Sequence, residues 1–309
     1  MTEPTYLERL AVNLAPGAAQ LSEERCVRHA AYLLAAQNPD GGYSGRAGPS
    51  DLYYTGFALR SLALLGALPP DVAERAAGFL RAAMNRSASV VDFFSLLYAA
   101  RLIQTMGGPD VLGGSAPGWQ DRTATILEAF RTPDGGYAKT PGAASGSTYH
   151  TFLVALSYEL IERPLPEPER VRAFLHSRRR ADGGYVEVGV QKRSGTNPTA
   201  AAVATLRMLG GEPADESAVS FLASLVSAEG GFCANTRVPL ADLLSTFTGL
   251  WTLYDLGALD RLDPAAARGY VEALERPAGG FRGGAWDDGA DVEYTFYGLG
   301  SLALLSLPT

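Results

Sequence analysis

One phrase recurs along the chain: two glycines and an aromatic residue, then a polar loop, then an apolar run. Five copies can be read directly, and they begin at Gly41, Gly135, Gly183, Gly230 and Gly279. The last four starts are 48, 47 and 49 residues apart, and the first two are 94 apart, which is twice 47. We therefore predict a sixth copy that has lost its glycines and whose apolar run is Val91–Ile103. Six tandem units of this length predict a repeat architecture.

Each unit predicts two helices, an outer one with mixed faces and an inner one that is apolar nearly all round. The outer helices are expected at 23–36, 71–83, 121–130, 167–177, 215–226 and 263–274. The inner helices are expected at 51–65, 91–103, 149–161, 198–209, 242–256 and 291–305. The outer helices open on Asp or Glu, which a helix N-terminus prefers.

A helix that is apolar on all sides must be buried on all sides. Six such helices, alternating with six half-exposed ones, are satisfied by two concentric rings, although an open solenoid would also bury them. We predict an all-α fold: a single α/α toroid spanning residues 1–309, with a short leading helix from Tyr6 to Leu14. The glycine pairs are expected to be turns with positive φ, because a phosphate-binding loop would not recur five times.

The composition excludes some functions. The net charge is −7, and the longest Lys/Arg block is Arg178–Arg180, which argues against nucleic acid as the main partner. Only Cys26 and Cys233 are present, as expected of a reducing compartment. No apolar run approaches the roughly 20 residues of a membrane span, so we predict no transmembrane segment and a cytoplasmic location.

Aligning the inner helices on a recurrent Thr or Ser places their N-terminal ends on one rim. The rim is expected to carry Asp51, Ser147, Asn197, Asp242, Asp291 and Glu293. Six helix N-termini at this rim would create a positive field. Below it, aromatic residues are expected to line a central apolar cavity, although about half of them would instead fill gaps between the rings. The aromatic residues are Tyr53, Phe57, Phe93, Tyr98, Phe152, Phe247, Trp251 and Tyr297.

This layout resembles the β subunits of protein prenyltransferases and, more widely, the terpenoid cyclase/prenyltransferase toroids. The resemblance covers Gln20 to the end, and its matching segments are Gln37–Tyr43, Pro133–Tyr137, Asp182–Tyr185 and the closing run Tyr294–Leu305. That closing run is most similar to the last inner helix of the β subunit of Rab-type geranylgeranyltransferase. The resemblance implies an isoprenoid or similar lipid as ligand, a zinc ion that generates the thiolate of a substrate cysteine, and a helical α subunit or a peptide as a possible partner.

The family holds its zinc with Asp, Cys and His, and this sequence departs from that set. The family's Asp falls on Asp242, its Cys on Leu244 and its His on Tyr294. Leucine cannot bind a metal and a neutral phenol is a poor ligand, so no zinc cofactor is predicted, whereas Mg²⁺ stays possible. Cys233 is the one replacement ligand considered, and His150 lies too far round the ring.

The resemblance also suggests roles for other residues. Arg193 and Arg237 are candidates for a diphosphate clamp, the alternative being scattered solvated charge. Asp242 and Glu293 are candidate acid/base or Mg²⁺-binding carboxylates. The side chains expected to contact the lipid are Tyr53, Tyr54, His150, Phe152, Phe247, Trp251, Tyr294 and Tyr297.

Two other functions stay open. Terpene cyclases of the second class protonate an alkene with the third residue of a DxDD motif, and Asp291-Val292-Glu293-Tyr294 is similar, with Glu293 at the third position. The alternative is that Asp291 and Glu293 are ordinary acids at a helix start. The chain could also be a non-catalytic lipid- or peptide-binding module. The Cys26 and His29 pair, one turn apart, is interpreted as an accident of an exposed helix face.

Overall fold

The computed structural model describes residues 4–84, 89–113, 117–211 and 215–307. The described chain is almost entirely helical. The inner ring consists of α3 (Leu52–Leu64), α5 (Val90–Thr105), α7 (Thr148–Leu160), α9 (Thr196–Met208), α11 (Leu243–Asp255) and α13 (Val292–Leu304). The outer ring consists of α2 (Glu23–Ala35), α4 (Pro70–Ala83), α6 (Trp119–Glu128), α8 (Pro168–Arg178), α10 (Glu216–Ala223) and α12 (Pro264–Ala273). The remaining elements are α1 (Tyr6–Ala18), the 3-10 helix η1 (Leu259–Arg261) and the antiparallel strands β1 (Phe281–Arg282) and β2 (Ala290–Asp291).

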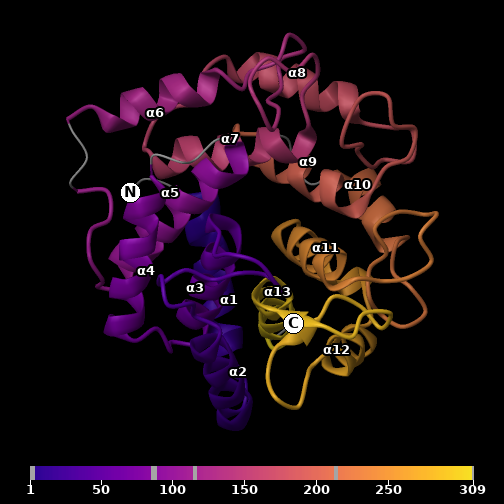
Figure 1. Ribbon diagram of the computed structural model, residues 1–309. Coiled ribbons are helices and arrows are strands. Elements are labelled where there is room, and N and C mark those ends of the chain that lie inside the picture. Colours follow the sequence, from indigo (N-terminus) through magenta and orange to yellow (C-terminus); the bar gives the residue numbers. More distant parts are fainter. Residues whose placement is uncertain (1–3, 85–88, 114–116, 212–214, 308–309) are drawn as a thin grey trace.

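The two rings are closed. Each inner helix packs against the next, and α13 packs against both α11 and α3. Figure 1 shows the inner helices surrounded by the outer ones, with the first and last units side by side. The predicted α/α toroid is therefore confirmed, and the predicted ends of the inner and outer helices lie within three residues of the observed ones, whereas the leading helix continues to Ala18, four residues beyond its predicted end. Part of the predicted insertion at 106–118 and of the loop before α5 falls outside the described residues.

The repeated glycines are required by close approach as well as by conformation. Gly41 has a φ of +87°, and a Cβ atom there would lie 2.1 Å from the backbone oxygen of Arg75 in α4. Gly279 has a φ of +93°, and its Cβ would lie 2.8 Å from the backbone oxygen of Arg28 in α2. Gly41 thus contacts α4 of the next unit along the chain, and Gly279 in the last unit makes the equivalent contact with α2 of the first unit. This shared contact closes the ring.

The recurrent Thr that aligns the units makes a repeated pair of hydrogen bonds. In the first unit the Thr55 hydroxyl accepts from the Tyr43 backbone N–H at 2.9 Å and donates to the Asp51 carbonyl at 2.6 Å. In the last unit Thr295 accepts from Phe281 N–H and donates to the Asp291 carbonyl. The Thr therefore fixes the glycine turn to the start of each inner helix, which explains why one register fits the units.

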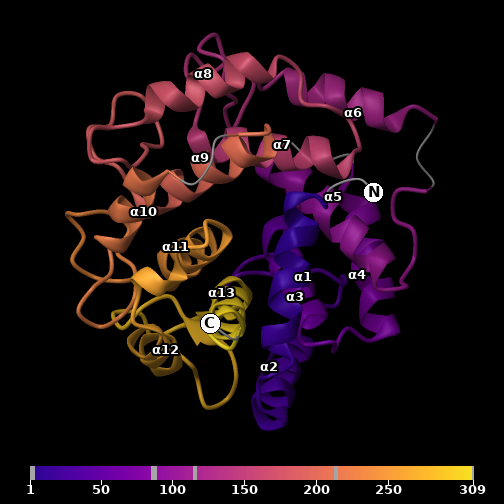
Figure 2. The ribbon, with the colours of Figure 1, turned by 180° about the vertical axis from the view of Figure 1, so that it is seen from behind.

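Helix α1 lies across the end of the ring where the inner helices finish (Figure 2). The Tyr6 N–H donates to Glu159 Oε2 at 3.0 Å, near the end of α7, and the Tyr254 hydroxyl donates to Asn13 at 3.0 Å, near the end of α11. A Cβ at Gly17 would lie 1.9 Å from the backbone oxygen of Ala303, so α1 packs closely on α13. The sequence predicted this helix but not its position.

Closure of the ring is reinforced by a buried charged cluster. Glu275, just after α12, accepts hydrogen bonds from Arg25 at 3.0 Å, from Arg28, and from His29 Nε2 at 2.8 Å, all on α2. His29 is fully buried, and its Nδ1 accepts from the Gly280 N–H at 3.0 Å. The interpretation of the Cys26 and His29 pair as an accident of an exposed face is therefore wrong for His29. Burial opposes ionisation of Glu275, but these three donors outweigh it and lower its pKa to about 2.

No described helix combines the length and the apolar character that crossing a membrane requires.

Candidate functional site: the central cavity

The ring encloses a central cavity of about 370 Å³, which lies within the usual range of ligand pockets. All six inner helices contribute side chains to it, together with α1 and the loop before α9. Most of the lining is apolar, and it comprises Tyr6, Leu7, Leu10, Tyr53, Phe57, Phe94, Tyr149, Phe152, Leu153, Leu156, Ala200, Ala201, Leu244, Phe247, Trp251, Phe296 and Tyr297. The remaining lining residues are Arg60, Glu187, Asn197, Thr248 and Thr252.

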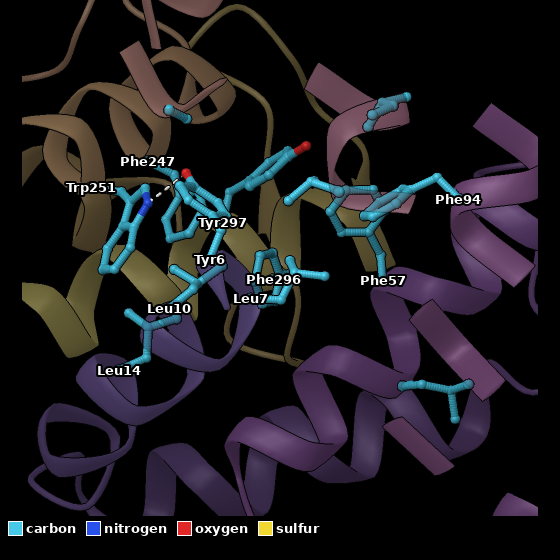
Figure 3. Packing of buried hydrophobic residues seen from close by; sticks show 14 of the residues in the cluster. Tyr6, Leu7, Leu10, Leu14, Phe57, Phe94, Phe247, Trp251, Phe296 and Tyr297 are labelled. Carbon is cyan, nitrogen blue, oxygen red and sulfur yellow. Dashed lines mark hydrogen bonds between the residues drawn. The ribbon is translucent and has the colours of Figure 1, made fainter. Parts of the chain in front are cut away.

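Helix α1 forms the floor of the cavity. Figure 3 shows Tyr6, Leu7 and Leu10 beside Trp251 and Tyr297. The Trp251 indole N–H donates to the Tyr6 hydroxyl at 2.6 Å, so both polar atoms are satisfied inside an apolar site. Burial raises the pKa of Tyr6, which keeps the phenol neutral. The cavity is therefore closed at the end opposite the rim.

The wall formed by α3, α11 and α13 is aromatic. The ring centroids of Phe247 and Phe296 are 5.3 Å apart, those of Phe247 and Tyr297 are 5.5 Å apart, and those of Phe57 and Tyr297 are 5.2 Å apart. Aromatic faces carry partial negative charge and attract cations. This wall suits an unsaturated hydrocarbon, and it would also stabilise positive charge developing on one.

Glu293, in the first turn of α13, adjoins this wall. Its Oε1 accepts hydrogen bonds from the hydroxyls of two lining residues, Tyr53 at 2.6 Å and Tyr297 at 3.2 Å, while Oε2 accepts none from a described residue. Burial, followed by the neighbouring Asp291 carboxylate, raises the pKa of Glu293, although the two phenols oppose the shift. The carboxyl thus tends to hold its proton, and its anion has donors already in place. This combination suits a proton donor.

Glu293 itself is not among the lining residues, and the carboxyl that does line the cavity is that of Glu187. Glu187 follows the third glycine turn, accepts a hydrogen bond from the Ser147 hydroxyl, and accepts from the Tyr149 N–H at 3.3 Å. Burial raises its pKa. Sequence reasoning missed Glu187 because this residue lies in the loop before α9, whereas its hydrogen-bond partners lie at the start of α7, in the preceding unit.

Arg60 also lines the cavity. It was not identified from the sequence, because the candidate cations were loop residues and Arg60 lies on an inner helix. It lies on α3, where its guanidinium carbon stands 4.6 Å from the ring centroid of Phe57, 4.4 Å from that of Tyr98 and 5.5 Å from that of Phe94. It is the only charged residue of α3, in an otherwise apolar helix. A lone arginine in such a helix is the signal that would have found it.

Several predicted contact residues do line the cavity, namely Tyr53, Phe152, Phe247, Trp251 and Tyr297. Three others, Tyr54, His150 and Tyr294, stand outside its lining. The His150 Nδ1 atom is buried and finds no hydrogen-bond partner among the described residues, and burial, then the charge of Lys139, lowers the pKa of His150 to about 4. The side chain is therefore held neutral.

The predicted rim acids Asp242 and Asp291 cap inner helices. Asp242 accepts from the Ser245 N–H at 2.7 Å and from its hydroxyl at 2.8 Å. Asp291 accepts from the Tyr294 N–H at 2.9 Å and from Arg46 Nε at 3.2 Å. Burial raises the pKa of both carboxyls. Their hydrogen bonds fix the starts of α11 and α13 and thereby position the cavity wall.

The two arginines predicted as a diphosphate clamp, Arg193 and Arg237, are exposed in loops and do not line the cavity. Neither side chain makes a hydrogen bond or ion pair with the described part of the chain. Arg46, another loop cation, is already engaged by Asp287 at 2.7 Å and by Asp291.

The residues present do not fit the zinc that the resemblance implies. Among the described residues, no three His, Cys, Asp or Glu side chains come together as a metal-binding group. Leu244 faces the cavity in place of a thiolate, and both Asp242 oxygens already accept hydrogen bonds from Ser245. Burial, then the charge of Asp242, raises the pKa of the Cys233 thiol, which disfavours the thiolate that zinc requires.

Comparisons with solved structures find the same fold in proteins of different activity. Candida albicans protein geranylgeranyltransferase-I, solved in complex with GGPP, matches with a TM-score of 0.71 and 14% identity over 90% of each chain. A type II terpene cyclase, MstE from Scytonema, in complex with geranylgeranyl dihydroxybenzoate, matches with a TM-score of 0.64 and 16% identity, over 96% of this chain and 99% of the cyclase. An α-1,6-mannanase from Salegentibacter matches at 0.57 and 11%, over 96% and 98%.

No curated protein matches the sequence. The family model described as the prenyltransferase alpha-alpha toroid domain matches twice, over residues 10–185 and 102–306, and the two overlapping matches follow from the internal repeat. Together they span nearly the whole chain. The protein is therefore a member of the prenyltransferase alpha-alpha toroid domain family.

Proposed function

We propose that this protein binds the hydrocarbon chain of an isoprenoid or similar lipid in its central cavity. The observation that carries the proposal is the shape and chemistry of that cavity: about 370 Å³, closed below by α1, and walled by aromatic and aliphatic side chains from the whole inner ring. Burying apolar ligand surface against such walls contributes about 25 cal/mol per Å² before the costs of association. The Rab-type acceptor and the helical or peptide partner that the resemblance suggests stay predictions.

Binding can be followed through Trp251, because its indole lines the cavity. Titration with geranylgeraniol and with geranylgeranyl diphosphate should change its fluorescence with saturation, and Trp251→Phe should remove that part of the signal. Ala200→Phe should weaken binding strongly, because Ala200 lines the cavity and a benzyl group there would occupy space that the lipid needs. Ala265→Phe, at an exposed position of α12, makes the same change away from the cavity and should leave binding intact. Equal binding by both variants would refute the cavity as the lipid site.

A second candidate function, cyclisation of the bound polyprene, is favoured by the environment of Glu293. The neutral carboxyl would transfer its proton to a terminal alkene, so that a C–H bond forms and a carbocation remains. An internal alkene then attacks this cation to close a ring, and loss of a proton to a carboxylate or water regenerates an alkene. The reaction is a net isomerisation and needs no oxidant. The aromatic wall formed by Phe57, Phe247 and Phe296 is placed to stabilise the cation.

Two features support Glu293 as the acid in this scheme, one before the proton transfer and one after it. Burial raises the pKa of Glu293, so this carboxyl keeps its proton to a higher pH than an exposed glutamate does, and the phenols of Tyr53 and Tyr297 stabilise its anion after transfer. The proposal assigns no step to zinc or to the loop arginines. A binding module without chemistry is the competing outcome, and it would be selected by tight lipid binding with no product.

A further inference from the structure

We propose that the ligand carries a single carboxylate and that Arg60, deep in the cavity, binds it. The inference rests on the proposed lipid-binding function and names the chemical class of the lipid. It comes from a charge that the protein itself leaves without a counterion inside an aromatic site.

The environment of the guanidinium is the first observation. Arg60 lies over the rings of Tyr98, Phe57, Phe94 and Phe296, which come from α3, α5 and α13. Its Nε is buried with no hydrogen-bond partner, and no hydrogen bond or ion pair joins its guanidinium to any described residue. Aromatic faces offset part of the desolvation of a cation, but they leave the five N–H donors of an arginine unsatisfied. An anionic acceptor supplied by a ligand would satisfy them.

The charge count of the cavity limits what that anion can be. Arg60 is the only Lys or Arg among the described lining residues, and Glu187 lines the same space. The positive charge of Arg60 acts on Glu293 without forming an ion pair with it. A diphosphate carries several negative charges and is usually held by several cations. One guanidinium matches one carboxylate, which it can bind through two parallel N–H donors.

The position of Arg60 also gives the ligand a direction. Arg60 comes nine residues after the N-cap Asp51, whereas Glu293 comes two residues after the N-cap Asp291. At 1.5 Å of rise per residue, their Cα atoms differ in depth by about 10 Å along parallel inner helices. A lipid whose carboxylate binds Arg60 would have its acidic group deep in the ring and its hydrocarbon chain free to extend toward Glu293. The bound carboxylate would also neutralise the guanidinium, whose charge would otherwise oppose a carbocation in this cavity.

The test compares three ligands that share one chain: geranylgeranoic acid, geranylgeraniol and geranylgeranyl diphosphate. With the wild-type protein we expect the acid to bind at least about tenfold more tightly than the alcohol, as charged hydrogen bonds allow. Arg60→Met should lower the affinity for the acid to that for the alcohol and leave the alcohol unchanged, because methionine packs well against aromatic rings. Arg60→Lys should restore part of the preference.

Arg101→Met is the matched control, because Arg101 is also on an inner helix but pairs with Glu162 at the surface. It should retain the preference for the acid. The inference is overturned if wild type binds acid and alcohol equally, if Arg60→Met keeps the preference, or if the diphosphate binds best and does so without Arg60. In those cases binding of the alcohol would still uphold the proposed function. Failure of all three ligands to bind would instead overturn both proposals.

Discussion

At the scale of single residues, the proposed cyclisation depends on Glu293. Replacing it by Gln keeps an oxygen that can accept from Tyr53 and Tyr297 but removes the proton donor. We expect lipid binding to be unchanged and the rate of product formation to fall by about 10²-fold or more, the usual contribution of a general acid. Asp288→Asn makes the same substitution at an exposed loop position and should retain the rate. Full activity of Glu293→Gln would remove this residue from the mechanism.

The pH dependence has a defined sign. The pKa of Glu293 is raised above its ordinary value of 4.5. In the proposed cyclisation the protonated form is the active one. The rate should therefore be level at low pH and decline as pH rises through the raised pKa of Glu293. A rate that increased with pH over the same interval, measured with saturating lipid, would show that the carboxylate acts as a base instead.

Asp242 supports a prediction about metal. Both of its carboxylate oxygens accept hydrogen bonds from Ser245. At the position where the family has its cysteine ligand, this chain has Leu244, which cannot bind a metal. Dialysis against EDTA should therefore change lipid affinity and product formation by less than about twofold, whereas removing a required metal usually abolishes activity. The measurement is lipid titration and product analysis before and after dialysis, with metal content determined in parallel. A loss of function that Zn²⁺ restores would contradict it.

At the scale of elements, α1 sets the depth of the cavity. Leu7 forms part of the floor, so Leu7→Ala should deepen the cavity and shift the preference toward lipids with longer chains. The same change removes a buried side chain and should lower the free energy of unfolding by about 2–5 kcal/mol. Affinities for a series of polyprenols of increasing length would measure the first effect, and chemical denaturation the second.

Leu14→Ala separates these two effects. Leu14 is buried on the same helix but does not line the cavity, so this variant should be destabilised to a similar degree with no change in chain-length preference. If both variants shifted the chain-length preference equally, the shift would come from a general loosening of α1, and Leu7 would not set the depth of the cavity.

At the scale of the whole molecule, the cluster around Glu275 joins the first unit to the last. The pKa of Glu275 is lowered from 4.5 to about 2, so it contributes about 3 kcal/mol that is present above pH 4.5 and lost as pH falls toward 2. Glu275→Gln should lower the free energy of unfolding by about 3–5 kcal/mol at neutral pH, because it removes the carboxylate that Arg25 and Arg28 share. Within the described chain, each arginine then keeps only a more exposed partner, Glu272 or Glu24. In this variant the free energy of unfolding should also depend much less on pH in the acid range, because the titrating carboxyl is gone.

Glu272→Gln is the control for that change, because Glu272 pairs with the same Arg25 but is 40% exposed. Glu272→Gln should lower the free energy of unfolding by less than about 1 kcal/mol. Chemical denaturation between pH 3 and 7, a range chosen around the ordinary pKa of a glutamate, would compare the two variants. Equal stabilities would mean that helix packing alone closes the ring.

The sequence by itself determined the repeat units from which the ring is built, whereas closure of the ring could only be predicted, because an open solenoid would bury the same helices. The period of about 47 residues, the glycine turns and the wholly apolar inner helices each follow from local rules, and six units of one size repeat one contact until Gly279 meets α2. The sequence also determined which helix ends share a rim, because the recurrent Thr makes the same hydrogen bonds in the first and last units. These features recur in several units, and their recurrence allows them to be recognised in the sequence.

Only the tertiary structure decided what the ring encloses. Arg60, Glu187 and the α1 floor occur once each. The repeat aligns the segments that carry Arg60 and Glu187, but the other units have no Arg or Glu at the equivalent positions, and α1 belongs to no repeat unit. His29 likewise acquires its partner Glu275 only when the ring closes. A single charge on an apolar helix has no periodic signal, and its role depends on which neighbours surround it. The fold therefore follows from the residues that the repeat units share, whereas the chemistry of the cavity depends on the residues at which the units differ.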